Sequence, residues 1–195
     1  MTYLSQALVP RTEALHAGCV DGYAWHRAIW EAFPDRPDAD RDFLFRVDPD
    51  GSSFRVLLLS VHKPAALLWM TWLTKVVAPA FLDHATYRFQ LRANPTMRRS
   101  SDGRRLGIYT EDRLRAWMQR KAGENGFSIP DDALVVGAPI DETFVRNGTR
   151  GKHVAIDFTG VLAVEERDRF RNAFAHGIGA AKSFGFGLLM LQPLT

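Results

Sequence analysis

Tyr23 and His26 are the residues of this sequence whose types and spacing best suit acid–base chemistry. In a helix, two residues three positions apart project from the same face. Histidine exchanges protons near neutral pH, and a tyrosine hydroxyl can take part in proton transfer. Arg27 follows directly and could hold a phosphate. The alternative is a surface or hydrogen-bonded histidine without a chemical role, because one helical Tyr-x-x-His is common by chance.

The helix expected to carry this pair has two distinct faces. Asp21 can cap its start, and Pro34 stops it after about Phe33. One face is an apolar stripe that should pack against the core, formed by Trp25, Ala28, Ile29, Ala32 and Phe33. The face with the tyrosine and histidine is centred roughly 140° away from that stripe. The pair is therefore expected where a ligand can reach it.

A glycine-rich segment, GIGAAKSFGFG, covers residues 177–187. A dinucleotide-binding fingerprint follows a strand and opens a helix, whereas this segment follows an expected helix and precedes the last expected strand. A Walker A loop needs Gly-Lys-Ser/Thr before a helix, which is lacking here. The glycines could let the backbone approach a phosphodiester chain, with Lys182 adding a positive charge. A plain turn between helix and strand is an equally good interpretation of the spacing.

Positive charge is concentrated in one stretch of the chain. The net charge is only +3, but Arg88 to Lys121 contains ten Lys/Arg and three Asp/Glu, a local charge of +7. The remainder has fifteen basic and nineteen acidic residues, or −4. Phosphate contacts provide most non-specific affinity for nucleic acids, so this asymmetry favours a polyanion-binding face. The alternative is a solvated basic segment, which is the commoner meaning of a charge run.

The composition excludes several classes of protein. A chain of 195 residues with 46% hydrophobic and 24% charged residues is typical of a globular protein with one or two domains. No apolar run reaches the ~20 residues of a membrane helix, and the start lacks the features of a signal peptide, so we expect a cytoplasmic protein without membrane contact. Cys19 is the only cysteine, which excludes an internal disulfide; we interpret it as a small half-buried side chain. Cys and His show no zinc-site spacing.

Alternation and turn signals indicate a sheet in the first half. Residues 3–9 alternate apolar and polar types, and segments 43–47 and 54–60 flank the turn signal Asp48-Pro49-Asp50-Gly51. The remaining segments of this half are a polar loop, a short helix and a strand with a linker, at 37–42, 64–70 and 72–81.

The second half repeats this plan. Its strands are expected at 87–93, 134–136, 153–164 and 188–192, and its helices at 110–125 and 166–176. Each half approximates βαββαβ, the ferredoxin-like unit with helices on one face of an antiparallel sheet. We therefore predict an α+β fold of two tandem ferredoxin-like domains. Domain 1–82 carries the helix with the Tyr–His pair, and domain 83–195 carries the basic stretch and the glycine-rich segment.

Five segments form a recognisable set in a fixed order. They are YAWHR at 23–27, RDFLFR at 41–46, FQLRANPT at 89–96, AWMQRK at 116–121 and the glycine-rich segment. They resemble the catalytic helix, second strand, junction strand, second-domain helix and glycine-rich loop of the CasE endoribonucleases of type I-E CRISPR systems, in the RAMP superfamily. The glycine-rich loop alone would indicate only the superfamily.

This resemblance implies a metal-independent nuclease, without a cofactor, that cuts the hairpin repeats of precursor CRISPR RNA. It also implies that the enzyme stays bound to the mature guide RNA with the other subunits of the surveillance complex, and is a monomer before assembly. His26 and Tyr23 match the catalytic positions. The residues expected to bind RNA are Arg27, Arg98, Arg99, Arg104, Arg105, Arg146, Arg150, Lys152, Gly177, Gly179, Lys182 and Gly185. The chain departs from some members at Glu31, where they have a basic residue.

The expected chemistry is attack by the 2′-hydroxyl of the RNA on the adjacent phosphorus. His26 would protonate the leaving 5′-oxygen, and Tyr23 would orient or help deprotonate the 2′-hydroxyl. Arg27 and Lys182 would stabilise charge on the phosphate. The rival function is a non-catalytic RNA-binding subunit of the same complex, which would not need the Tyr23/His26 face.

Overall fold

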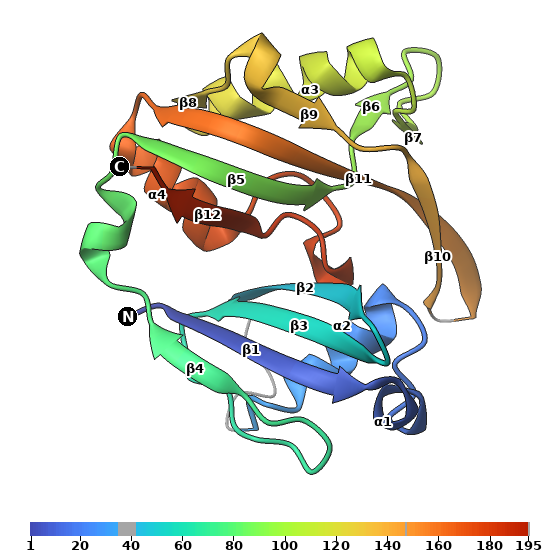
Figure 1. Cartoon of the computed structure of the whole chain (residues 1–195). Coiled ribbons are helices and arrows are strands. Elements are labelled where there is room, and N and C mark those ends of the chain that lie inside the picture. The colour runs from blue at the N-terminus through green and yellow to red at the C-terminus, as the bar shows by residue number, and fades with distance from the viewer. Residues whose placement is uncertain (35–41, 147, 195) are drawn as a thin grey trace. The chain divides into compact units, whose positions relative to one another are not determined.

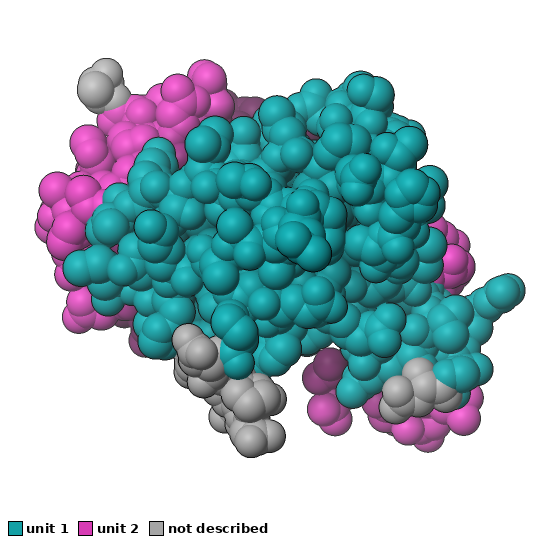
Figure 2. Space-filling model, turned by 90° about the horizontal axis from the view of Figure 1, so that it is seen from below, with its two compact units in different colours: residues 1–77, 144–151, 182–185 teal, residues 78–143, 152–181, 186–195 magenta. Residues whose placement is uncertain are grey.

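The computed structural model describes residues 1–34, 42–146 and 148–194. The chain divides into two compact units, which are coloured separately in Figure 2. Unit 1 contains residues 1–77, 144–151 and 182–185, and unit 2 contains 78–143, 152–181 and 186–195. The main division follows residue 77, near the boundary expected between residues 82 and 83, and two short segments from late in the chain also group with unit 1.

Unit 1 is built on a four-stranded antiparallel sheet (Figure 1). Its strands are β1 (Tyr3–Pro10), β2 (Phe43–Asp50), β3 (Ser53–Ser60) and β4 (Leu73–Val76). They lie in the order β2-β3-β1-β4, which is the order of a ferredoxin-like sheet. The expected hairpin is confirmed, with Gly51 at a φ of +57° in the turn between β2 and β3. The expected strand and linker after residue 72 are confirmed by β4 and a 3₁₀ turn, η1 (Pro79–Leu82).

Two helices follow β1. Helix α1 (Arg11–His16) was not predicted from the sequence; it begins directly after Pro10, which is also the last residue of β1. Helix α2 (Gly22–Trp30) begins as expected, because an Asp21 carboxylate oxygen accepts a hydrogen bond from the Ala24 amide at 2.8 Å. The apolar stripe of α2 is buried as predicted.

The expected short helix at 64–70 is wrong. The described residues between β3 and β4 contain no helix, and the segment is held instead by a bridge in which Leu67 and Met70 exchange backbone hydrogen bonds of 2.9 and 3.2 Å. Met70 is buried in the unit 1 core, although the segment that carries it is not helical. Unit 1 therefore lacks the second helix of a complete ferredoxin-like unit. The loop expected at 37–42 and Arg41 of the second-strand motif lie outside the described residues, apart from Asp42.

The main sheet of unit 2 is also antiparallel. Its long strands are β5 (Thr86–Ala93), β10 (Ile140–Arg146), β11 (Thr149–Val164) and β12 (Leu189–Pro193), in the order β10-β11-β5-β12. Two short strands, β8 (Phe127–Ser128) and β9 (Leu134–Val136), also pair with β11. Helices α3 (Glu111–Glu124) and α4 (Arg167–His176) complete the second ferredoxin-like unit (Figure 1). The predicted α+β fold of two tandem ferredoxin-like units is confirmed, except that the first unit has no second helix.

The basic stretch contains a small hairpin of its own. Strands β6 (Thr96–Arg98) and β7 (Arg105–Gly107) form a separate two-stranded sheet. The turn between them includes Gly103 at a φ of +69°, a conformation that favours glycine.

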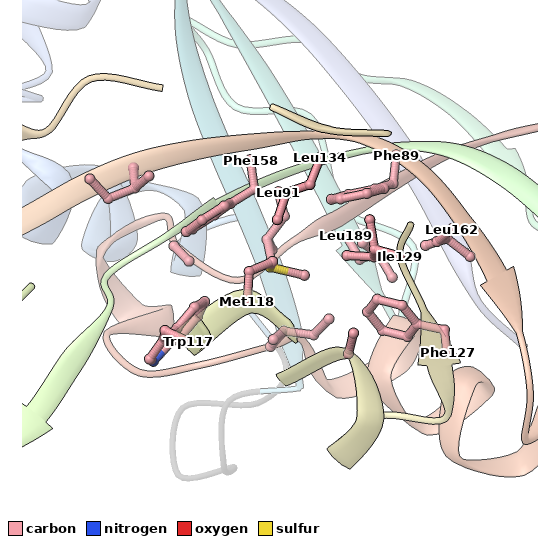
Figure 3. Close-up of a cluster of buried hydrophobic side chains, with 14 of the residues drawn as sticks. Phe89, Leu91, Trp117, Met118, Phe127, Ile129, Leu134, Phe158, Leu162 and Leu189 are labelled. Atoms are coloured by element: carbon pink, nitrogen blue, oxygen red, sulfur yellow. The ribbon is translucent and has the colours of Figure 1, made fainter. Parts of the chain in front are cut away.

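The core of unit 2 fixes α3 against the sheet (Figure 3). Trp117 is buried and its ring stacks on Phe158, with centroids 5.7 Å apart and an interplanar angle of 19°. Trp117 is therefore a core residue of unit 2. In the described part of the chain, no helix is both long and apolar enough to cross a membrane.

Candidate active site

Tyr23 and His26 lie side by side on α2, as their spacing predicted. Their ring centroids are 6.4 Å apart and their planes differ by 28°. Both side chains are half-buried, and the His26 ring packs against Phe43 and Phe45 of β2 at 5.5 and 6.3 Å. The sheet thus forms an apolar wall that fixes the imidazole while leaving part of it accessible.

The segment Lys182–Gly185 of the glycine-rich loop packs on the start of α2. Phe184 lies 5.8 Å from the Tyr23 ring. A Cβ on Gly22 would be 2.5 Å from the Phe184 carbonyl oxygen, and a Cβ on Gly185 would be 3.2 Å from the Phe45 ring. Gly185 also has a φ of +89°. Glycine is therefore required at both positions, because the loop backbone approaches α2 and β2 too closely for a side chain.

The tip of the β10–β11 hairpin contacts the same end of α2. The Val145 amide donates a hydrogen bond of 3.0 Å to the second carboxylate oxygen of Asp21, which also caps the helix. Phe144 lies 4.4 Å from Phe184, between centroids. These contacts hold three distant segments of sequence together within unit 1.

Two guanidinium groups flank the Tyr23 ring. Arg27 lies 5.8 Å and Arg146 lies 5.7 Å from the ring centroid, both within the range of a cation–π interaction. Both arginines are exposed. Lys182 is half-buried in the 3₁₀ turn η3 (Lys182–Phe184). The residue before it, Ala181, has a φ of +61°, an uncommon conformation for a non-glycine residue that is often found at functional loops.

Gly177 and Gly179, which are also expected to bind RNA, have structural roles. Gly177, at a φ of +75°, follows α4, and its amide donates to the Ala173 carbonyl at 2.8 Å. Gly179, at a φ of +89°, leaves room for the Trp117 ring, which a Cβ would meet at 3.4 Å. The interpretation of this segment as a turn closing a helix therefore holds for Gly177. It does not account for Gly185, which packs on β2.

The four arginines of the β6–β7 hairpin fall into two classes. Arg99 and Arg104 share one counter-ion, with their Nε atoms 3.4 and 3.6 Å from the two carboxylate oxygens of Asp102. Arg98 and Arg105 are directly opposite each other on the two strands. Both line a hollow of about 570 Å³ in unit 2, together with Arg120, Lys121 and the backbone of Gly179 and Ala180.

A second hollow of about 680 Å³ shares part of this lining and extends to Lys152 and His153. Lys152 is exposed, and its Nζ lies 2.8 Å from Asp141, which also accepts a 2.9 Å hydrogen bond from Tyr109. These hydrogen bonds raise the pKa of Lys152 and lower the pKa of Asp141. Arg150, which is also expected to bind RNA, is exposed on β11.

Sequence reasoning missed the polar pair Asn94 and His153. The buried Asn94 amide accepts a hydrogen bond from the Val154 amide at 3.2 Å and lies 3.0 Å from His153 Nδ1. Because the Asn94 NH₂ is the donor to this nitrogen, Nδ1 is unprotonated. Burial lowers the pKa of His153, in agreement with a neutral ring. Asn94 belongs to the junction-strand motif, which was the available signal.

Glu31 lies away from the Tyr–His pair. It is the exposed residue that ends α2 and lines a separate hollow of unit 1 with Glu13, His16 and Trp69. Within the described ranges, no group of three or more His, Cys, Asp and Glu is placed to hold a metal ion. The site in unit 1 thus combines a fixed imidazole, a phenol and nearby cations, which suit proton transfer to and from an anionic substrate.

Comparison with known proteins gives matches over nearly the whole chain. A family model described as "CRISPR associated protein" matches residues 2–193. The chain is 35% identical to the CRISPR system Cascade subunit CasE of Escherichia coli, over 98% of this chain and 100% of that protein. It is 31% identical to the CRISPR-associated endoribonuclease Cse3 of Thermus thermophilus, over 95% and 97%. A structure of Thermus thermophilus Cse3 bound to an RNA representing a pre-cleavage complex matches with a TM-score of 0.84 and 25% identity, over 98% of this chain and 99% of that chain.

Proposed function

Because the chain belongs to this family of CRISPR associated proteins, we propose that it is an endoribonuclease that cuts the hairpin repeats of precursor CRISPR RNA. The proposal rests on one observation. At the start of α2, the Tyr23 ring lies beside His26 and is contacted by both Arg146 and the glycine-rich loop. The related Cse3 is named an endoribonuclease, and one structure holds it with a pre-cleavage RNA. A module that only holds RNA would not need an imidazole and a phenol on this face.

The proposed reaction is an internal transfer at one phosphodiester. The 2′-oxygen attacks the adjacent phosphorus, and the bond from phosphorus to the 5′-oxygen breaks in line. His26 donates a proton to the leaving 5′-oxygen. The Tyr23 oxygen accepts a hydrogen bond from the 2′-hydroxyl and orients this group, and the 2′-hydroxyl proton passes to water during the attack. The products are a 2′,3′-cyclic phosphate and a 5′-hydroxyl.

The cations around Tyr23 have an electrostatic role in this reaction. Negative charge grows on the phosphate oxygens in the transition state, and fixed positive groups stabilise it most where water is partly excluded. Arg27, Arg146 and Lys182 supply this charge, so no metal ion or cofactor is required. Arg146 would supply the positive charge that some family members have at the position of Glu31.

We also propose that the protein remains on its product and joins the surveillance complex. The related CasE of Escherichia coli is named a Cascade subunit. The basic lining of the hollows in unit 2 provides a sequence-independent hold on a stem that is not consumed by the reaction. The rival function, an RNA-holding subunit without activity, shares this part of the proposal.

The test is cleavage of a hairpin repeat RNA in EDTA, with the ends of the products identified. The expected result is one cut that leaves a 2′,3′-cyclic phosphate and a 5′-hydroxyl, and no cut when the nucleotide before the scissile bond is 2′-deoxy. Cleavage of the 2′-deoxy RNA, or a requirement for added metal, would overturn the mechanism. Binding without cleavage under all conditions would leave only the RNA-holding subunit.

A further inference from the structure

Asp21 joins two elements of unit 1 through the two oxygens of one carboxylate. Its Oδ1 atom accepts a hydrogen bond of 2.8 Å from the Ala24 amide and caps α2. Its Oδ2 atom accepts a hydrogen bond of 3.0 Å from the Val145 amide, near the end of β10. A helix cap needs only one acceptor, which asparagine and serine supply as well as aspartate does. The second oxygen, which sets aspartate apart from these residues, is used by the hairpin.

Val145 lies between the two residues of the hairpin tip that reach the site. Alternate residues of a strand point to the same face, so Phe144 and Arg146 share one face of β10. The Phe144 ring lies 4.4 Å from the Phe184 ring, between centroids. The Arg146 guanidinium lies 5.7 Å from the centroid of the Tyr23 ring. A hydrogen bond to the Val145 backbone therefore restrains both side chains against the start of α2.

Arg146 has few other restraints. Its side chain is exposed, and among the described residues no carboxylate lies within ion-pair distance of it. Ordering a long side chain at such a position costs conformational entropy, and a cation–π contact at an exposed site is weak. The hydrogen bond from the Val145 amide to a carboxylate is charge-assisted and roughly twice as strong as a neutral one. This backbone bond is thus the main directional restraint on the place of Arg146.

We propose that Asp21 is a positioning residue that holds Arg146 at the Tyr23 ring before RNA binds. This inference rests on the proposed function, in which Arg146 stabilises charge on the scissile phosphate. One oxygen of Asp21 fixes the start of the helix that carries Tyr23, and the other fixes the strand that carries the cation. Asp21 acts on the reaction only through these two backbone contacts, and the arrangement that they fix is one that the RNA does not have to build.

The charge of Asp21 makes the expected effect opposite in sign to that of simple electrostatics. Asp21 is negative and lies two residues before Tyr23, so a neutral residue in its place should attract an anionic substrate more strongly. If the charge alone mattered, neutral variants would cleave RNA at least as fast as the parent. If Asp21 positions Arg146, the same variants cleave more slowly although they bind RNA at least as tightly.

The test compares three substitutions at this one position. Asp21→Asn and Asp21→Ser keep an acceptor for the helix cap and lose the second carboxylate oxygen, whereas Asp21→Ala loses both. Single-turnover cleavage of saturating hairpin repeat RNA, RNA affinity and thermal melting are measured for each. We expect all three to cleave at least about tenfold more slowly than the parent, and only Asp21→Ala to melt clearly lower.

The control for the change of charge is Asp83→Asn, which removes an exposed carboxylate that pairs with Arg171. This variant should cleave at the parental rate. Parental rates in Asp21→Asn and Asp21→Ser, with a loss in Asp21→Ala alone, would reduce Asp21 to a helix cap and overturn its positioning role.

A double variant tests whether Asp21 acts through Arg146. Arg146→Gln alone should cleave more slowly than the parent, because it loses the cation. Asp21→Asn/Arg146→Gln should then cleave within about twofold of Arg146→Gln, since there is no guanidinium left to position. A rate that falls by the product of the two single effects would show that Asp21 acts independently of Arg146, and the positioning role would be wrong.

Hydrogen exchange gives a measurement that does not depend on cleavage. β10 is the edge strand of its sheet, and the Val145 amide bonds to Asp21 outside that sheet. In NMR this amide should exchange faster in Asp21→Asn than in the parent. Equal exchange would overturn the hold on the hairpin, whether or not the parent cuts RNA. Faster exchange in the variant of a parent that does not cut RNA would overturn the nuclease and support the hold on the hairpin.

Discussion

The role of the Tyr23 hydroxyl can be tested without changing the contacts of the ring. The ring packs between Phe184 and the guanidinium groups of Arg27 and Arg146, contacts that phenylalanine would keep. We expect Tyr23→Phe to bind hairpin RNA normally and to cleave it on the order of 10² times more slowly in a single-turnover assay. Tyr3→Phe, which loses a hydroxyl that contacts Met1, is the matched control. An unchanged rate in Tyr23→Phe would restrict this residue to packing.

Cys19 is a buried thiol close to the site but outside its chemistry. It is 4% exposed, and burial raises the pKa of the thiol to about 11, with Glu31 adding to the increase and Arg27 opposing it. The reactive thiolate is therefore scarce at pH 8. We expect a thiol reagent to label the native protein slowly and the unfolded protein quickly and stoichiometrically. Fast labelling of the native state would contradict the burial, and loss of cleavage on labelling would implicate Cys19 in the site.

The contact between α2 and the glycine-rich loop is tested at Gly22. Alanine normally stabilises a helix relative to glycine by roughly 0.5–1 kcal/mol. At this position its Cβ would lie 2.5 Å from the Phe184 carbonyl oxygen, so the loop must move. We expect Gly22→Ala to lower the cleavage rate by at least about tenfold in a protein that still binds RNA.

The control for this prediction is Gly123→Ala in α3. Apart from its chain neighbours and the backbone of its own helix, no described residue has an atom within 4 Å of a Cβ placed there, so the helix should gain stability and cleavage should be unchanged. Full activity in Gly22→Ala would show that the position of the loop against α2 does not matter for catalysis.

The elements of the site could be predicted from sequence in part. The start and apolar face of α2 follow from Asp21 and from the helical spacing of its buried residues, both local signals. Helix α1 was not predicted because Pro10 is both the last residue of β1 and the residue before the helix, so no loop separates the two elements. The segment at 64–70 was misassigned because a short apolar run has the same appearance in a helix and in a buried irregular segment.

The joining of distant segments could not be predicted from local patterns. Val145 and Asp21 are 124 positions apart in sequence, and Arg146 reaches Tyr23 through the same hairpin tip. The family resemblance indicated Arg146 as an RNA-binding residue, but it did not predict that Arg146 lies over the Tyr23 ring. The sequence also did not predict that Arg99 pairs with Asp102 whereas Arg98 faces Arg105, because these contacts depend on the register of β6 and β7.

The pH dependence of stability for the whole molecule should contain a contribution from His153. Burial lowers the pKa of this histidine, and protonation of Nδ1 would break its hydrogen bond with Asn94. Above about pH 6.5 the His153 ring is neutral in both the folded and the unfolded protein. As the pH drops below about 6.5, the unfolded protein binds the proton before the folded protein does. The free energy of unfolding should therefore fall as the pH drops below about 6.5.

Denaturant melts at several pH values check this contribution. His153→Gln should lose part of the fall in stability between about pH 6.5 and 5, whereas His16→Gln, at an exposed position, should follow the parent. An identical pH profile for all three proteins would show that His153 is not the responsible group.

The central claim for the whole molecule is that the Tyr–His face of α2 cuts RNA. The most direct measurement is single-turnover cleavage of a hairpin repeat RNA in EDTA by the parent, His26→Ala and the control His16→Ala, with binding measured on the same samples. We predict one cut by the parent and by His16→Ala, and a loss of at least about a hundredfold in rate by His26→Ala with binding retained. Cleavage by His26→Ala at the parental rate would contradict the account, as would a parent that binds the RNA and leaves it intact.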